Sequence, residues 1–227
     1  MKELCMILIY ADAHTQFDEL LNTYKIHEDS VEAVYLAGDQ CPNEPLEKIL
    51  ADVACPVRFI LGNHDPDREH WLKNHFGLWE GHLHCRTHST AEITVAGLSG
   101  VFRGGIWYPG NQVYYFNREQ MYYESIARRQ LYRGQIPRKH WGSIFYEDLN
   151  TLAKLRADIL LTHEAPSTHH HGFKEIDELA VLMEASLIVH GHHHQSYQAV
   201  TSSGIKVMGV GKQDCLLLDK QMITNLN

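Results

Sequence analysis

Side chains that could bind a divalent metal ion stand in five short clusters, each directly after an apolar run of the sequence. Their carboxylate oxygens, amide oxygen and imidazole nitrogens form a mixed donor set that suits divalent first-row ions. The clusters are Asp12-Ala13-His14, Gly38-Asp39, Gly62-Asn63-His64-Asp65, His163 and Gly191-His192-His193-His194. One such cluster alone would favour helix capping, because Asp and Asn often cap helices. Five in one chain indicate a metal site.

The preceding runs are apolar on both faces, which is typical of parallel strands covered by helices. They are Leu4–Tyr10, Ala33–Ala37, Val57–Leu61, Ile159–Thr162 and Leu187–His190. Amphipathic stretches of helical length, around Phe17–Tyr24 and Pro45–Val53, separate the first three. This alternation predicts a mainly parallel sheet whose strands point the same way. All five clusters should then meet at its carboxyl edge, where open α/β sheets bind ligands.

Two further segments predict a second sheet. Leu83–Phe102 contains alternating apolar and polar residues interrupted by glycines, and the tail Ser196–Leu218 shows the same pattern. We therefore expect an α/β fold, built as a two-sheet α/β sandwich with helices outside. The composition shows no internal repeat or linker, so we predict a single domain over 1–227.

The number of donors predicts two ions rather than one. The candidate donors are Asp12, His14, Asp39, Asn63, His163, His192 and His194. They are too many for one tetrahedral ion, but they suit two ions that share a bridging carboxylate. Two dications bring four positive charges, of which two carboxylates and a bridging hydroxide would remove three. Such a site stays positive, and ions about 3.5–4 Å apart are known to clamp and hydrolyse phosphate esters.

In this order, the motifs DxH, GD, GNHD, a later lone His and GHxH resemble those of the calcineurin-like metallophosphoesterase superfamily, over Asp12 to His194. The resemblance implies the fold and a binuclear metal centre. The first ion would be held by Asp12, His14 and His194, and the second by Asn63, His163 and His192. Asp39 would bridge both ions. His64 would face the scissile phosphate and help to protonate the leaving oxygen.

The motifs also differ between branches of this family. Phosphoprotein phosphatases follow GD with a further Asp and an Asp-Arg-Gly and end the third motif in Glu, whereas here the third motif ends in Asp65. That motif is more similar to phosphodiesterases, nucleotidases and repair nucleases, and Val95–Phe102 is similar to lariat-debranching enzymes. We expect a phosphodiesterase acting on a nucleotide or nucleic acid. One alternative is a phosphomonoesterase on a small metabolite or phosphoprotein. The other is a non-catalytic scaffold, as in a retromer subunit family that tends to lose the histidine at the position of His64.

Several neighbours of the motifs have expected structural roles. Asp65 precedes Pro66 and should cap a helix over Pro66–His75, with a second option of orienting His64. His193 should point away from the metals. The glycines Gly38, Gly62 and Gly191 should form the tight turns between strands and donors. For His169-His170-His171 we favour a solvated loop over a metal site, because adjacent residues rarely converge on one ion.

The segment 104–146 is crowded with aromatic and basic residues, and we expect it to be a cap or specificity insert. It either packs as a small cap or offers a platform on which bases stack and phosphates find positive charge. A helix is predicted over Asn117–Arg133, with Asn117 as its N-cap and Gly134 after its end. The candidate substrate contacts are Arg103, Trp107, Tyr108 and Arg118.

The composition restricts the class of protein, its cellular location and its cofactors. The net charge of −8 disfavours a basic nucleic-acid-binding protein, and no apolar run is long enough to span a membrane. Five scattered cysteines suit reduced thiols in the cytoplasm. The expected cofactors are two divalent ions, Mn²⁺ in the first place, with iron or zinc as alternatives. The sequence leaves the oligomeric state open.

Overall fold

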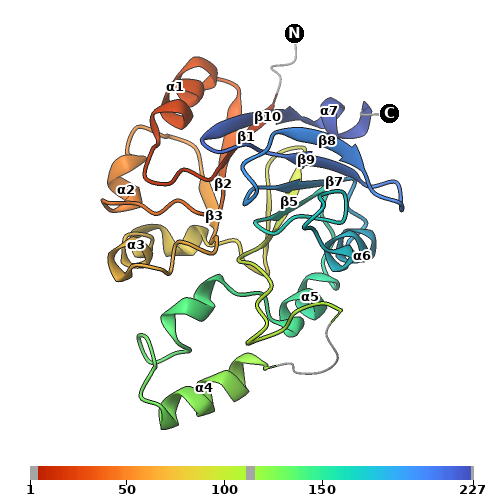
Figure 1. Ribbon diagram of the computed structural model, residues 1–227. Helices are drawn as coiled ribbons and strands as arrows, with labels where there is room; N and C mark the ends of the chain where they lie inside the picture. The colour runs from red at the N-terminus through yellow and green to blue at the C-terminus, as the bar shows by residue number, and fades with distance from the viewer. Residues whose placement is uncertain (1–4, 111–115, 226–227) are drawn as a thin grey trace.

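The computed structural model describes residues 5–110 and 116–225, and it forms two β-sheets flanked by helices (Figure 1). The first sheet has the strand order β10-β1-β2-β3. Its strands are β1 (Met6–Ala11), β2 (Val31–Ala37), β3 (Val57–Ile60) and β10 (Asp214–Asp219). The first three are parallel to one another, and β10 pairs antiparallel with β1.

The second sheet has six strands in the order β4-β5-β6-β7-β9-β8. Its strands are β4 (Thr87–Ser89), β5 (Thr94–Leu98), β6 (Ile159–Thr162), β7 (Leu187–His190), β8 (Tyr197–Val200) and β9 (Lys206–Gly209). The four central strands run parallel, and the two edge strands are antiparallel to their neighbours. The two-sheet α/β sandwich predicted from the sequence is therefore confirmed.

One part of that prediction is wrong: the five donor-bearing strands do not share a single sheet. The first three belong to the first sheet, whereas β6 and β7 lie in the second. The tail is divided as well, because β10 returns to pair with β1. The donors still meet, since the two sheets pack face to face and their carboxyl ends lie together. His163 Nδ1, after β6, donates to the carbonyl of Ala37 at the end of β2, 2.9 Å away.

Alternation along the strands explains why these runs are apolar on both faces. In β1, Ile7 and Ile9 face the second sheet and pack with residues such as Ile159 and Val189. Leu8 and Tyr10 point the other way, into a separate cluster beneath the helices of the first sheet. β1 is thus buried on both sides, as a helix-covered parallel strand requires.

The helices occupy the outer faces of the sandwich (Figure 1). On the first sheet these are α1 (Asp18–His27), α2 (Leu46–Ile49) and α3 (Glu69–Lys73), and on the second α5 (Tyr146–Leu152) and α6 (Lys174–Leu182). Short 3₁₀ helices cover Phe76–Gly81 and Arg138–Gly142, and α7 (Lys220–Asn225) follows β10. Within the residues described, no helix combines the length and apolarity needed to cross a bilayer.

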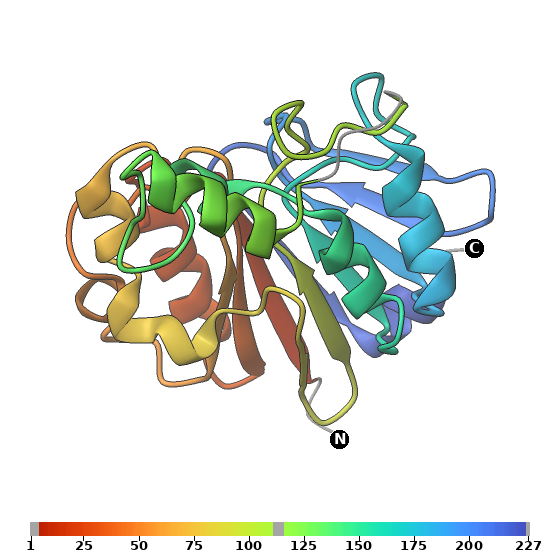
Figure 2. The same ribbon diagram turned by 90° about the horizontal axis from the view of Figure 1, so that it is seen from below.

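The insert carries α4 (Arg118–Ala127), which stands apart from both sheets in Figure 1 and is drawn in front of the first sheet in the view of Figure 2. The predicted cap is confirmed, because the Asn117 side chain accepts from the backbone N–H of Gln120 in a capping box. The helix ends at Ala127, earlier than the predicted Arg133. Arg129 adopts a left-handed φ of 55° two residues later, a conformation that does not continue an α-helix.

Candidate metal centre

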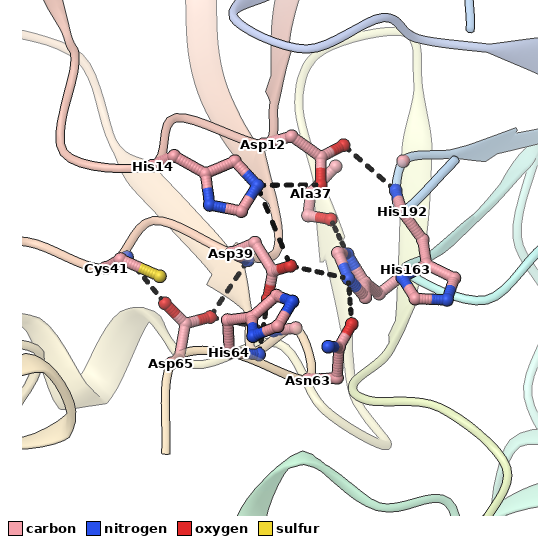
Figure 3. Close-up of polar contacts among 12 residues, drawn as sticks. Asp12, His14, Ala37, Asp39, Cys41, Asn63, His64, Asp65, His163 and His192 are labelled. Carbon is pink, nitrogen blue, oxygen red and sulfur yellow. Dashed lines mark hydrogen bonds and ion pairs between the residues drawn. The ribbon is translucent and has the colours of Figure 1, made fainter. Parts of the chain in front are cut away.

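The seven predicted donors lie together where the loops after β1, β2, β3, β6 and β7 meet. Figure 3 labels all of them except His194. One group comprises Asp12, His14 and His194, whose donor atoms all lie within 4.8 Å of one another. The Nε2 atoms of the two histidines are 3.1 Å apart. Asp12 Oδ1 lies 3.6 Å from His194 Nε2 and 4.0 Å from His14 Nε2. Strand ends from both sheets therefore build this group.

A second group comprises Asp39, His163 and His192. His163 Nε2 lies 3.4 Å from Asp39 Oδ2 and 3.1 Å from the side-chain oxygen of Asn63. Because Nδ1 of His163 donates to the carbonyl of Ala37, the neutral ring keeps its lone pair on Nε2, facing these oxygens. The Asn63 amide thus joins the group as an oxygen donor.

Asp39 lies between the two groups. Its Oδ2 is 3.4 Å from His163 Nε2 in one group and 4.0 Å from His14 Nε2 in the other. Its Oδ1 accepts the backbone N–H of His64 at 2.7 Å, which fixes the carboxylate plane. Burial alone would raise the pKa of Asp39, but the neighbouring His163 imidazole outweighs it and lowers this pKa below the usual range.

Asp12 provides the test of whether a cation fits. Its side chain is fully buried, and among the described residues its Oδ1 has no hydrogen-bond partner, whereas Oδ2 accepts the N–H of His192 at 2.9 Å. Burial in this position raises the pKa of Asp12 to about 7. A buried carboxylate oxygen that faces two imidazole nitrogens is costly without a cation. The residues present therefore fit a divalent ion.

The predicted glycines matter because side chains pack directly onto them. A Cβ on Gly62 would overlap Asp39 Oδ1, and a Cβ on Gly38 would overlap His163 Nδ1. Gly38 also has a left-handed φ of 95°, so it serves the expected turn and the close approach together. A Cβ on Gly191 would come within 2.6 Å of Asp12 Oδ2. Each glycine thus leaves room for a donor side chain.

The capping role predicted for Asp65 is wrong. The following helix is α3, which begins at Glu69 after Arg68. Asp65 is instead fully buried and joins the loops after β2 and β3. Its carboxylate accepts the N–H groups of Gly62 at 2.8 Å, Asp39 at 3.0 Å and Cys41 at 2.8 Å (Figure 3). It holds two donor loops in register rather than capping a helix.

A residue that the sequence reasoning missed holds the ring of His64. Asp67 Oδ2 lies 2.7 Å from His64 Nδ1, so Asp67, and not Asp65, orients the imidazole. Nε2 remains available, and the ring centroid lies 5.9 Å from that of His14. The signal in the sequence was the i,i+3 spacing of His64 and Asp67, which places the two side chains together in a turn.

The four predicted substrate contacts separate into different environments. Arg103 lies at the donor face, where its Nη2 donates to the carbonyl of Asn63 at 3.3 Å. Tyr108 is 42% exposed. Trp107 is buried and packs edge-on against Phe102, with ring centroids 5.0 Å apart, and so belongs to the core.

Arg118 ties the insert to the second sheet's helices. Its guanidinium bonds the buried carboxylate of Asp148, with Nη2 3.0 Å from Oδ2, and also reaches Glu147 and His84. Among its described contacts none is with one of the seven predicted donors of the centre, so its position gives the predicted substrate role no support. An anchoring role accounts for its contacts.

The expectation for the histidine tract is partly wrong. His170 and His171 are exposed, but His169 is only 8% exposed, because its ring stacks on that of His193 with centroids 3.9 Å apart. His193 Nε2 lies 3.9 Å from the carboxylate of Glu164, the residue after His163. The sequence did not single out Glu164, and nothing in its local pattern indicates that it is buried.

Comparison with known proteins agrees with this architecture. The sequence profile of the family described as calcineurin-like phosphoesterase matches residues 6–196. An uncharacterized protein of Haemophilus influenzae is 34% identical over 210 residues, which cover 91% of each chain. This family membership implies a centre of two metal ions, for which the structure provides the two donor groups.

Solved structures show the same fold at lower identity. A protein of Thermus thermophilus superposes with a TM-score of 0.57 at 15% identity, over 95% of this chain and 99% of its own. A dimetal phosphatase of Danio rerio gives a TM-score of 0.57 at 12% identity, over 94% of this chain and 89% of its own. With the profile match over most of its length, the chain is a metal-dependent phosphoesterase of the calcineurin-like phosphoesterase family.

Proposed function

We propose that the two donor groups hold two divalent ions and that the chain hydrolyses a phosphodiester. The first ion would be held by Asp12, His14 and His194, and the second by Asn63, His163 and His192. Asp39 would contribute to both. The observation that carries this assignment is the position of Asp39 Oδ2, within 4.0 Å of imidazole nitrogens in both groups. Manganese is our first choice for both ions, with iron or zinc as alternatives.

When bound, the ions would supply Lewis-acid activation of the phosphate and of a water nucleophile. The protein's own residues supply position and a proton. Asp65 fixes the two loops that carry Asp39 and Asn63. His64 donates a proton from Nε2 to the leaving oxygen, and Asp67 holds the ring by accepting from Nδ1. The deeply buried residues thus set the geometry, and the half-exposed His64 meets the substrate.

Support for a diester comes from the openness of the donor face. The side chain of His64 is 49% exposed and that of His194 is 41% exposed, so neither ester substituent needs to be enclosed. A nucleotide or nucleic-acid diester remains our first substrate class, on the third motif GNHD. The buried position of Trp107 weakens the idea of an aromatic platform.

A specific observation favours phosphomonoesters as the second candidate. Arg103 lies beside Asn63, and its Nε is buried without a hydrogen-bond partner among the described residues. A guanidinium with an unused donor could bind the additional negative charge that a monoester carries. Arg103 is therefore the residue whose replacement separates the two substrate classes.

The deciding experiment compares bis-p-nitrophenyl phosphate with p-nitrophenyl phosphate, using manganese-loaded wild type and Arg103→Met. Higher kcat/KM for the diester, little changed in Arg103→Met, would support the diesterase. Strong preference for the monoester, lost in Arg103→Met, would contradict it. If neither compound nor a wider panel of phosphoesters is turned over while both ions bind, the non-catalytic scaffold replaces both proposals.

Cellular location also belongs to this proposal. The scattered cysteines suit reduced thiols, so we propose that the protein acts in the cytoplasm. Fractionation of cells that express the full chain tests this, and recovery with an exported marker protein would refute it.

A further inference from the structure

The turn that carries His64 holds its imidazole by a chain of short contacts. The backbone N–H of His64 donates to Asp39 Oδ1 at 2.7 Å, and the backbone N–H of Asp67 donates to the carbonyl of His64 at 2.9 Å. The Asp67 carboxylate then reaches back to His64 Nδ1. Both side chains are about half exposed, so packing alone does not fix them. The direction of the His64 ring therefore depends on where the backbone holds Asp67.

One side chain of the insert holds the far end of this turn. Arg138 Nε donates to the carbonyl of Pro66 at 2.9 Å, and Arg138 Nη2 donates to the carbonyl of Asp67 at 3.2 Å. A guanidinium presents its donors in a rigid planar fork, so two bonds to consecutive carbonyls fix an orientation as well as a distance. Arg138 Nη1 also lies 3.8 Å from the exposed carboxylate of Glu69, which is a weak surface pair.

The backbone behind Arg138 is itself packed against the turn. Arg138 begins the 3₁₀ helix that ends at Gly142. A Cβ on Gly142 would lie 2.4 Å from the carbonyl oxygen of Gly62 and 3.1 Å from Pro66 Cγ, so the two segments are in direct contact. The N–H of Val101, in the loop after β5, donates to the carbonyl of Gly142 at 3.2 Å. The guanidinium is therefore mounted on a segment that is fixed relative to the turn.

We propose that Arg138 is a positioning residue for His64, which it orients by clamping the Asp67 end of the turn. The inference rests on the proposed role of His64 as proton donor. It gives the insert a part in the reaction that requires no contact with the substrate. Among the described residues Arg138 contacts none of the seven metal donors, so its loss should displace the His64 ring without releasing an ion.

The test depends on the leaving group. A proton from His64 matters when the departing oxygen is basic, and it matters little when a nitro group stabilises the departing phenolate. We therefore compare kcat for diphenyl phosphate and for bis-p-nitrophenyl phosphate, using manganese-loaded wild type and Arg138→Met. The phenyl ester should lose about tenfold, since a misplacement of about 1 Å can cost about 10²-fold. The nitrophenyl ester should change little. If monoesters are the better substrates, phenyl phosphate and p-nitrophenyl phosphate take their place.

The controls separate positioning from general damage. Arg128→Met removes another arginine of the insert, which pairs with Glu124 on the surface of α4, and should leave both esters unchanged. Arg138→Met should retain the metal content of wild type. Circular dichroism checks its folding. If Arg138→Met misfolds, Arg138→Lys serves, because it keeps the charge but not the planar fork and should show the same selective loss, smaller in size.

Three results would overturn the clamp. They are equal losses on both esters, an unchanged rate on the phenyl ester, and a further loss when the Arg138 variant is combined with His64→Ala. His64→Ala alone, measured on the same esters, distinguishes this inference from the proposed function. A selective loss in His64→Ala without one in the Arg138 variant refutes the clamp alone. The absence of selectivity in His64→Ala refutes the proton donor, and the clamp with it.

Discussion

The donor edge and the insert use buried charge for different purposes. At the donor edge, Asp12 and Asp39 are buried with oxygen atoms that face imidazole nitrogens, an arrangement suited to a cation from outside the chain. Where the insert meets α5, the buried carboxylate of Asp148 in α5 is neutralised by Arg118 of the insert. Both regions bury carboxylates, but of the two only the donor edge leaves a described carboxylate oxygen without a partner. A carboxylate that lacks a partner, rather than burial itself, marks the site.

The two regions also differ in which residues adopt left-handed backbone conformations. Asp12, Asp39 and His192 adopt left-handed φ values of 50°, 53° and 71°. Such conformations cost non-glycine residues about 1–3 kcal/mol each and persist where the surroundings enforce them. In the insert, left-handed φ values occur at Arg129 and Arg133, in the turns after α4. Strain at the donor edge thus falls on the proposed metal ligands themselves.

The largest effect should come from His64→Ala. Loss of the proton donor should lower kcat by about 10²–10⁴-fold, as for other general acids. Bound metal should be unchanged, because His64 is not among the proposed ligands. The exposed His70 provides the control, and His70→Ala should retain wild-type kcat. Full activity of His64→Ala on phosphoesters with poor leaving groups would contradict its role.

The second-largest loss of activity is expected from Gly62→Ala, which adds a methyl group at this position. The Cβ would displace Asp39 Oδ1, and a misplacement of about 1 Å can cost about 10²-fold in rate. Steady-state kinetics of Gly62→Ala measures the loss. Gly104→Ala is the matched control, since nothing lies within 4 Å of a Cβ there. Equal losses in both variants would show that the effect is not local to the donor edge.

Asp67→Asn should have a smaller effect, because the His64 ring remains but is held less firmly. A loss of about tenfold in kcat, with KM little changed, is typical of residues that orient a functional histidine. A double-mutant cycle distinguishes positioning from general destabilisation. In a His64→Ala background, Asp67→Asn should cost nothing further, whereas an additive loss would rule out action through His64.

In the insert, the comparison predicts a change in stability without a change in turnover. Arg118→Met leaves the carboxylate of Asp148 with the N–H of Phe145 and the ring of His84 as its remaining partners among the described residues. It should lower the free energy of unfolding by about 2 kcal/mol, less than for a fully buried pair because Arg118 is 35% exposed. Urea denaturation measures this. Arg128→Met, whose partner Glu124 is also on the surface, should change stability little. A large fall in kcat for folded Arg118→Met would restore a substrate role for Arg118.

The donors could be predicted from the sequence because each stands next to the strand that positions it. A buried parallel strand ends at a fixed edge, so Asp12, Asp39 and His163 were placed without knowing which strands pair. The pairing itself could not be predicted. Runs such as Ile159–Thr162 are buried on both faces in either sheet, and their apolar pattern carries no information about the neighbouring strand.

The errors arose where tertiary contacts overrode a local pattern. Asp65 before Pro66 has the pattern of a helix cap. Its carboxylate instead accepts three backbone N–H groups from two loops. His169 stands in a polar tract, yet the ring of His193 from another loop covers it. Such contacts depend on how loops from separate strands approach, which a local pattern does not record.

The central claim is that one carboxylate, Asp39, joins two cation sites. The most direct test is electron paramagnetic resonance of the manganese-loaded protein, combined with metal analysis. Wild type should give the spectrum of an exchange-coupled manganese pair, and Asp39→Asn should lose the coupled signal, bound metal and turnover together. If Asp39→Asn kept both ions, their coupling and full activity, the assignment of Asp39 would be wrong.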